Sequence, residues 1–451
     1  MAKSRRAVVL VTEGVAPALL NDFIDRGWLP GFAELFRTGA RGDLASHIVP
    51  YEPPGLLTAF SGAPSADHGW FSYWTVHEPD HTPKPNTSDQ LRVKLFWSRP
   101  EFCNKHLSII NLFGTHPPVP VPGELISYPM TQTLRACYPD NLLATLHKVG
   151  LPYSHDVSVW FKARARQEFV PQVIEADRRR AAMALHFYDN GSDAVVVNLT
   201  GIDRFSHLYW QELEEGSRVP LADSAILAAY RCADDLIRAL LHRMDDRTTL
   251  IAFSEIGFGP LRNYVCVNEI MASAGMLTWK RPGMEVDWKR TVAAESVQGS
   301  SGININLAGR YQDGTVTAGE YDAVRSNAAK YLADAINPHT GLRLFKAVMP
   351  RENVYPGVGQ DHAPDLILFP EDERYLPRGD PRWSLHVKRE LQSGWHRNGS
   401  YWAAVGADVR PGRRDHVASL SEILPAIELA LGMSVSSDHR AIFVDNPQPV
   451  S

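Results

Sequence analysis

The valine-rich run Ala194–Leu199 constrains the fold of this chain more than any other stretch. It predicts a strand buried on both faces, as in the open α/β sheets that place their functional sites at the carboxyl ends of the strands. Asp203 and His207 follow, four residues apart, on the turn that we expect after this strand. A carboxylate oxygen and an imidazole nitrogen at this edge suit a divalent metal ion. On its own, such a pair is more commonly a capping aspartate and a packed histidine, so the metal interpretation depends on further motifs.

Strands and helices alternate along most of the chain. Strands are expected at residues 6–12, 42–48, 107–112, 194–199, 249–253, 303–307, 364–369 and 401–406. Helices are expected at 16–26, 30–38, 55–61, 171–188, 222–243, 319–335 and 420–431. This alternation predicts an α/β fold with a doubly wound, mainly parallel sheet flanked by helices.

A chain of 451 residues is too long for one small core. We expect one α/β core built from residues 1–70, 186–260 and 346–451. Residues 71–185 are predicted to be an inserted cap that contributes some of the core sheet, and residues 261–345 a second insertion. The two inserted regions are expected to form a lid over the site.

Composition argues against several classes of protein. The net charge of -5 shows no basic excess, which is unlike a nucleic-acid-binding protein. No stretch approaches the roughly 20 apolar residues of a membrane span. The apolar run after Arg6 is too short for a signal peptide and is interrupted by Glu13. We therefore expect a cytoplasmic protein that has no nucleic-acid or membrane partner. Its expected partner is a small-molecule substrate, and a homo-oligomer is compatible with the sequence.

A proline-rich turn, Val49-Pro50-Tyr51-Glu52-Pro53-Pro54, precedes the helix predicted at 55–61. Paired prolines pre-set the backbone for the start of a helix. Glu52 is therefore expected at or beside a helix N-terminus, where exposed N–H groups and the helix dipole favour an anion. A helix cap is the simplest explanation of this glutamate taken alone.

Further short motifs follow one another in a recognisable order. They are Glu13-Gly14, the helix from Glu52 to Gly62, His68-Gly69, Gly201 to His207, Ser254 to Pro260, Gly302 to Leu307, Ala363 to Leu366, and Gly394 to Arg397. This order resembles the alkaline phosphatase superfamily, on its type I phosphodiesterase and nucleotide pyrophosphatase side. The resemblance runs nearly end to end.

The resemblance implies two divalent ions and a Thr or Ser that takes up the phosphoryl group covalently. At the positions that hold one ion, this chain keeps the expected ligands, Asp203, His207 and His396. The other ion would be held by the first-strand Asp, the nucleophile and an Asp-His pair. Those four positions all depart from the pattern and carry Glu13, Glu52, Glu255 and Ile256.

Glu52 at the nucleophile's position closes the covalent route. A carboxylate can be a nucleophile, but here an anion would attack an anionic phosphoryl group. Ile256 replaces an imidazole ligand with an apolar wall. Tyr51, Ile256, Trp395 and Arg397 are the candidates for lining a pocket beside the site.

Three explanations remain open: a rebuilt metal centre, an inactive fold kept for binding, and residual phosphodiesterase chemistry. Random substitution after loss of function would place a glutamate at a given position about one time in fifteen. Glutamate at three ligand positions is therefore improbable under such decay and favours a rebuilt centre. Four carboxylates and two imidazoles are the ligand inventory of dinuclear iron or manganese carboxylate proteins. We therefore expect two divalent ions, with Fe or Mn favoured by the oxygen-rich ligands and Zn or Mg as alternatives.

For such a centre we predict metal-assisted hydrolysis of a small molecule, with Glu52 as a general base or a bridging ligand. One alternative is an oxygen-using Fe or Mn oxidase or oxygenase in small-molecule biosynthesis, and another is a catalytically inactive binding protein. Four negative charges against two divalent ions leave the centre nearly neutral. This charge balance points away from phosphate esters and towards a neutral or cationic substrate.

Overall fold

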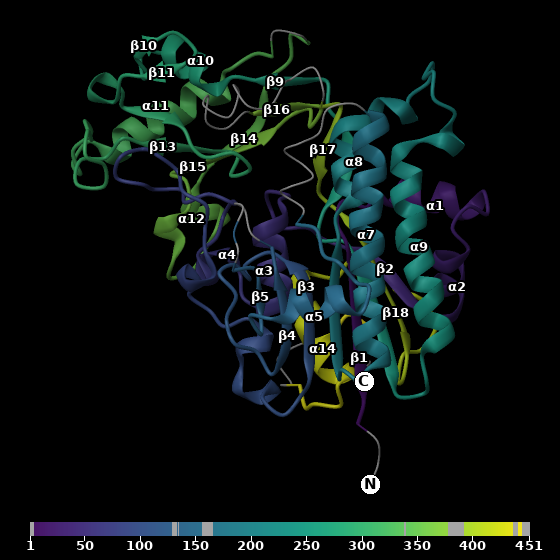
Figure 1. Cartoon of the computed structure of the whole chain (residues 1–451). Helices are drawn as coiled ribbons and strands as arrows, with labels where there is room; N and C mark the ends of the chain where they lie inside the picture. The colour runs from purple at the N-terminus through teal and green to yellow at the C-terminus, as the bar shows by residue number, and fades with distance from the viewer. Residues whose placement is uncertain are drawn as a thin grey trace, which may run out of the picture. The chain divides into compact units, whose positions relative to one another are not determined.

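The computed structural model of the chain describes residues 4–128, 133, 135–155, 166–337, 340–377, 392–435 and 441–443. The chain folds into two compact units (Figure 1). The core unit comprises Met1–Ala63, Thr87–Gly259 and His396–Ser451, and the second unit comprises Pro64–Asn86 and Pro260–Trp395.

Within the described residues, the core unit is built on a nine-stranded sheet. Its strands, in spatial order, are β19 (Gly412–Arg413), β2 (Ala40–Leu44), β18 (Ser400–Gly406), β7 (Thr248–Phe253), β1 (Arg6–Thr12), β6 (Ala194–Leu199), β3 (Leu107–Leu112), β4 (Gly123–Ser127) and β5 (Cys137–Tyr138). The run from β7 to β4 is parallel, whereas β18 is antiparallel to both of its neighbours and β5 is antiparallel to β4. The predicted α/β fold with a mainly parallel sheet is confirmed.

The register of the central strands brings three chain segments to one edge of the sheet. Strand β1 pairs in parallel with β6 on one side, where Thr12 lies opposite Leu199, and with β7 on the other. Neighbouring strands that run in one direction end at the same edge, which is where open α/β sheets carry their sites. The segments that follow β1, β6 and β7, with Glu13, Asp203 and Glu255, therefore lie side by side.

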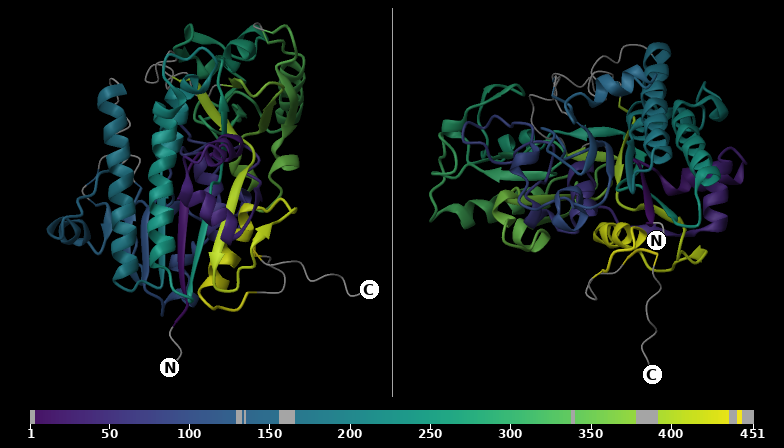
Figure 2. Two further views of the ribbon diagram at one scale, coloured as in Figure 1. Left: turned by 90° about the vertical axis from the view of Figure 1, so that its right-hand side faces the viewer. Right: turned by 60° about the horizontal axis from the view of Figure 1, so that its bottom comes forward.

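Helices cover both faces of this sheet, which explains why its central strands are buried along nearly their whole length. One face is covered by α1 (Pro17–Asp25), α2 (Pro30–Thr38), α7 (Arg166–Asp189), α8 (Gly201–Tyr209) and α9 (Ala225–Arg243). The other face is covered by α3 (Glu52–Ser61) and α14 (Ile423–Ala430). Figure 2 shows α7 and α9, in blue and teal, on the side of the sheet opposite the yellow helix α14. The short helix α5 (Leu142–Lys148) packs next to β5.

The second unit contains a four-stranded antiparallel sheet with its own apolar core. Its strands, in spatial order, are β12 (Ala293–Glu295), β13 (Gly302–Ile305), β15 (Leu366–Pro370) and β14 (Phe345–Pro350). Its helices are α4 (Ser65–His68), α10 (Val267–Ser273), α11 (Tyr321–Ala333) and α12 (Arg351–Val354). Two further strand pairs of this unit are β10 (Trp279–Arg281) with β11 (Glu285–Val286) and β16 (Tyr375–Pro377) with β9 (Asn263–Val265). Strand β17 (Gly394–Arg397) pairs with β8 (Gly257–Pro260), and His396, Arg397 and residues 257–259 of this pair belong to the core unit.

The observed division of the chain differs from the predicted boundaries. Residues 87–185, expected to be mostly an inserted cap, lie in the core unit because β3 and β4 extend its parallel run beyond β6. Residues 346–395, expected in the core, lie in the second unit because β15 pairs with β13 and β14. Residues 64–70 also belong to the second unit.

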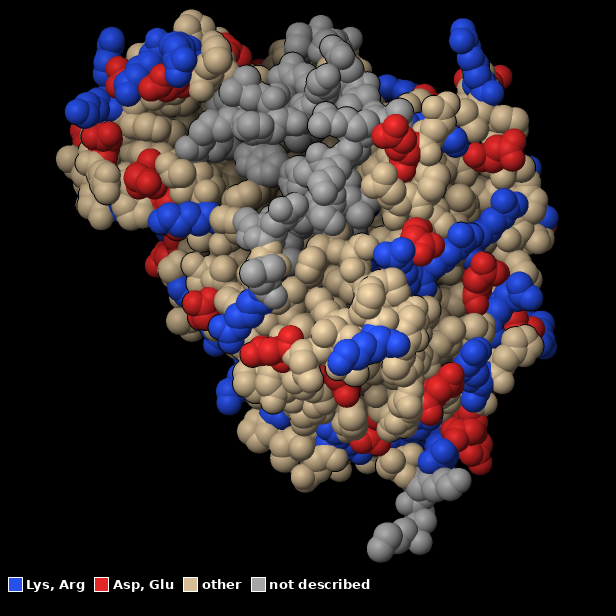
Figure 3. All heavy atoms as spheres, viewed as in Figure 1, with Lys and Arg blue, Asp and Glu red and all other residues tan. Residues whose placement is uncertain are grey.

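Charged side chains of both signs are interspersed on the face drawn in Figure 3. Among the described residues, no helix combines the length and the apolar character that a membrane crossing requires.

Substitution of Gly14, in the turn after β1, would test how tightly α8 packs against the carboxyl edge of the central sheet. The φ of Gly14, +86°, is a left-handed conformation, and a Cβ added there would lie 2.9 Å from the Cα of Asp203. Gly216 has nearly the same φ, +84°, but no described atom would lie within 4 Å of a Cβ added at that position. Both Gly→Ala changes should lose about 1 kcal/mol from backbone strain, and Gly14→Ala should lose clearly more because it displaces Asp203. Urea unfolding of the two variants measures the difference, and equal losses would contradict this packing.

Candidate metal centre

Asp203 and His207 lie one turn apart on helix α8, rather than on the turn that the sequence predicted after β6. Residues four positions apart share one face of a helix, so both side chains are directed the same way. Helix α8 begins directly after β6 because Asp177 of α7 accepts hydrogen bonds from the backbone N–H groups of Thr200 and Gly201, at 3.2 and 2.8 Å. This cap satisfies donors that a helix start otherwise leaves unpaired.

Four ligand atoms converge beside this helix, one each from Glu52, Asp203, His207 and His396, and all lie within 4.8 Å of one another. The Nε2 atom of His396 is 3.1 Å from Nε2 of His207, 3.2 Å from Oδ1 of Asp203 and 3.7 Å from Oε1 of Glu52. The Nε2 atom of His207 is 3.4 Å from the same Asp203 oxygen. All four side chains are buried. We call this group the ligand cluster.

The spacing of the ligand cluster fits one tetrahedral divalent ion. Metal–ligand bonds of about 2.1 Å place the donor atoms of a tetrahedron about 3.4 Å apart. The four separations given above run from 3.1 to 3.7 Å, and all four atoms lie within 4.8 Å of one another. Nδ1 of His396 lies 3.2 Å from the carbonyl oxygen of Pro50. A proton on Nδ1, donated to that carbonyl, leaves the Nε2 lone pair directed at the cluster, as metal-binding histidines require. Two carboxylates and two neutral imidazoles would balance the charge of one divalent ion.

Glu52 is the first residue of α3, and Tyr51, with an extended backbone, is the N-cap. Pro53 and Pro54 follow in the first turn, where their missing N–H groups cost nothing. The helix dipole favours the Glu52 anion at this end. The proline turn therefore places a carboxylate in the ligand cluster, at the position for which the sequence resemblance implies a nucleophile.

Glu13 and Glu255, two further predicted ligands, lie outside the four-atom cluster. Glu13 accepts a hydrogen bond from Nδ2 of Asn198 at 2.8 Å, and its other oxygen lies 3.6 Å from Arg204. Burial raises the pKa of Glu13 well above its ordinary value, and the opposing effect of Arg204 does not cancel this. Burial likewise raises the pKa of Glu255 well above the ordinary value, and neither of its oxygens bonds to another described residue.

Arg204, beside Asp203 on α8, supplies a permanent positive charge among these carboxylates. Its Nη1 donates to Oδ2 of Asp203, and its Nη2 donates to the hydroxyl of Tyr128 at 2.7 Å. Burial alone would raise the pKa of Asp203, but His207 and Arg204 hold it far below the ordinary value. Burial opposes protonation of His396, yet Glu52 and Asp203 raise its pKa above the ordinary value. The charges of the centre therefore depend strongly on one another.

The predicted pocket residues have different surroundings. The Tyr51 ring lies 5.5 Å from the His396 ring, and Arg397 Nη1 donates to the His396 carbonyl oxygen at 2.8 Å. Trp395 belongs to the second unit, where its ring packs edge-on against Tyr264.

An apolar side covers the imidazoles of the ligand cluster. Phe258 packs edge-on against His207 and His396, with ring centroids 4.9 and 5.3 Å away. Ile256, two residues earlier, is fully buried and offers no ligand atom where the family has a histidine. Phe258 was not singled out from the sequence.

Other residues that shape the centre were also missed from the sequence. Arg180 donates to Asp177 at 2.9 Å in a buried ion pair that supports the start of α8. Arg204 directly follows Asp203 in the sequence. A charged residue next to a predicted ligand could therefore have been recognised as part of the centre. Asn198, on β6, contacts Glu13, and Tyr128, directly after β4, contacts Arg204. Neither residue carries such a signal in the sequence.

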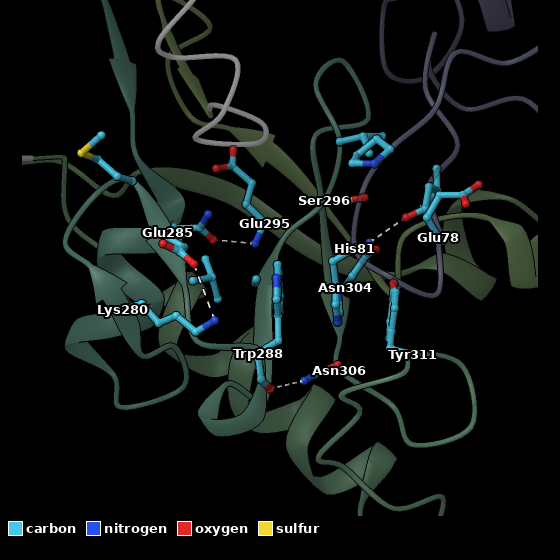
Figure 4. Close-up of a pocket in the computed structure, with 17 residues that line it drawn as sticks. Glu78, His81, Lys280, Glu285, Trp288, Glu295, Ser296, Asn304, Asn306 and Tyr311 are labelled. Atoms are coloured by element: carbon cyan, nitrogen blue, oxygen red, sulfur yellow. Dashed lines mark hydrogen bonds and ion pairs between the residues drawn. The ribbon is translucent and has the colours of Figure 1, made fainter.

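The second unit contains a separate cavity of about 190 Å³ (Figure 4). Beside it the ring of His81 is stacked between Trp288 and Tyr311, with centroids 3.7 and 4.2 Å away. Lys280 and Glu285 line the same cavity and form an ion pair at 3.6 Å. None of the ligand-cluster residues lines this cavity.

Comparison with known proteins identifies the family. A sequence model of the family described as type I phosphodiesterase / nucleotide pyrophosphatase matches residues 7–397. A comparison with curated proteins found no match.

Similar solved structures agree on the fold. Wild-type alkaline phosphatase PafA superposes with a TM-score of 0.64 at 12% identity, covering 98% of this chain and 99% of that chain. Phosphonoacetate hydrolase from Sinorhizobium meliloti 1021, in complex with phosphonoformate, has a TM-score of 0.60 at 14% identity, covering 95% and 96%. Murine ectonucleotide pyrophosphatase / phosphodiesterase 5 has a TM-score of 0.59 at 11% identity, covering 97% and 98%. At these identities the likeness shows a shared fold.

Removing one imidazole should weaken divalent-ion binding. We expect His207→Ala to lower the affinity for Zn²⁺ or Mn²⁺ by at least about tenfold, because one of the four ligand atoms is lost. His242→Ala, at an exposed position on α9, is the matched control and should bind like the unchanged chain. Calorimetric titration of chelator-treated protein measures both, and equal affinities would exclude His207 as a ligand.

Glu255 should make the stability of the metal-free chain fall as pH rises. Because its pKa is raised on folding, the folded state holds a proton that the unfolded state releases above about pH 4.5, so stability decreases through this window. Glu255→Gln should remove that loss and be more stable than the parent by roughly 1 kcal/mol or more at pH 7. At pH 4, where both states are protonated, the gain should vanish. Urea unfolding in the presence of a chelator tests both arms, and a gain that does not depend on pH would contradict the assignment.

Proposed function

Because the chain belongs to the type I phosphodiesterase and nucleotide pyrophosphatase family, we propose that it is a metal-dependent hydrolase that acts without the family's covalent step. One observation supports the proposal: a carboxylate oxygen of Glu52, at the position where the resemblance implies the nucleophile, lies within 4.8 Å of ligand atoms of Asp203, His207 and His396. The ion would be held by Glu52, Asp203, His207 and His396. When bound, a divalent ion would supply Lewis-acid polarisation of a substrate oxygen.

Glu52 has a different role here from the hydroxyl that it replaces. A buried carboxylate next to Asp203 repels an anionic phosphoryl group, so attack by Glu52 on phosphorus is disfavoured. A carboxylate in this place would instead hold the ion, and it is able to accept a proton from a water molecule that attacks the substrate. His207 and His396 would hold the same ion and would therefore be unavailable as proton carriers.

The apolar and charged surroundings bear on the substrate. Phe258 excludes water from one side of the imidazoles, which strengthens electrostatic interactions inside the centre. The buried carboxylates favour a neutral or cationic small molecule over a phosphate dianion. The similar structures are named as phosphatases, hydrolases and phosphodiesterases, so they give no support to the redox alternative or to a preference for Fe or Mn.

Metal content and substrate range test the proposal together. Protein purified without chelators should contain a divalent metal by elemental analysis, and Glu52→Gln should contain less because a charged ligand is lost. The parent chain, loaded with metal, should hydrolyse a nitrophenyl phosphodiester at a negligible rate and should form no phosphorylated protein. Glu215→Gln, a change at an exposed position outside the ligand cluster, is the control for metal content.

Two results would contradict the proposal in different ways. Absence of metal after loading would indicate a binding protein that keeps only the fold. Rapid metal-dependent phosphodiester hydrolysis would show that Glu52 does not block the family's usual reaction.

A further inference from the structure

The guanidinium of Arg204 lies beside two buried carboxylates, one of which stands at a position that the family resemblance implies for a second ion. Its Nη1 contacts Oδ2 of Asp203 and lies 3.6 Å from Oε1 of Glu13, and Tyr128 fixes the other nitrogen. Glu13 is one of the residues at the second-ion positions. The arginine side chain is only 7% exposed, so little water screens its charge.

Asp203 separates the two cation positions. Its Oδ1 belongs to the ligand cluster, 3.4 Å from His207 and 3.2 Å from His396. Its Oδ2 is the oxygen that accepts from Arg204. The Asp203 carboxylate therefore faces the ligand cluster with Oδ1 and the guanidinium of Arg204 with Oδ2.

A second divalent ion does not fit beside this arginine. A guanidinium cannot lose its proton in a protein, and at the short distance set by Asp203 and Glu13 it would repel a divalent ion strongly. The second position has also lost its imidazole, because Ile256 offers no ligand atom.

We propose that the centre binds a single divalent ion and that Arg204 takes the place of the second cation. This inference rests on the proposed metal-dependent function and revises the two ions expected from the sequence. Arg204 is a positioning residue: it orients Asp203, lies beside Glu13 and keeps a fixed positive charge next to the ion position. Unlike a second metal, this charge cannot dissociate and is not removed by a chelator.

The test is the number of ions bound per chain. Chelator-treated protein is titrated with Zn²⁺ or Mn²⁺, and bound metal is measured by elemental analysis after removal of free ion. The parent chain should bind about one ion, and Arg204→Met should bind about two because the carboxylates around the guanidinium become available. Arg204→Lys retains the charge and should still bind about one.

The outcomes separate this inference from the proposed function. Two ions in the parent chain, or a second ion absent from a folded Arg204→Met variant, would overturn the inference and leave the metal-dependent function standing. No ion in the parent chain would overturn the proposed function itself. Circular dichroism of each variant establishes folding, and the parent stoichiometry decides the case even if Arg204→Met does not fold.

Discussion

Buried negative charge at one edge of a parallel sheet is the constraint on which this structure depends. The carboxylates of Glu13, Glu52, Asp203 and Glu255 are all at most 2% exposed. Charges removed from water in this way are costly unless a cation, a hydrogen bond or a proton compensates each one. Asp203 is compensated on both of its oxygens: Oδ1 lies beside the imidazole of His207, and Oδ2 accepts a hydrogen bond from Arg204. Glu255 is compensated by a proton, because burial raises its pKa.

The same constraint links the fold to the proposed chemistry. Parallel pairing of β1 with β6 and β7 brings the segments after these strands together, and the proline turn before α3 adds Glu52. The scaffold of the family therefore presents the carboxylate of Glu52 to the ligand atoms of Asp203, His207 and His396. The fold places the group, and the identity of the side chain decides what the group is able to do.

Much of the fold followed from local patterns in the sequence. The apolar runs at 6–12 and 194–199 predicted β1 and β6 with the bounds observed, because a strand covered on both faces needs consecutive apolar residues. The boundaries of the two units differ from the expected ones. The strand expected at 364–369 is one example: its apolar pattern would be the same in the core sheet as in its observed pairing with β13. Asp203 was placed on a turn because the apolar pattern ends at Leu199; the helix there depends on Asp177, which caps it from another helix.

The sequence alone determined the kinds of ligand present: the Asp-x-x-x-His pair, the late histidine and the glutamate before two prolines are all local motifs. Only the tertiary structure decided which of them meet. Glu52 joins Asp203, His207 and His396, whereas Glu13 lies against Asn198 and Arg204. The reason is physical: strand register and helix packing set distances between residues far apart in the chain, and a guanidinium is directed by partners, such as Tyr128, that no spacing in the chain reveals.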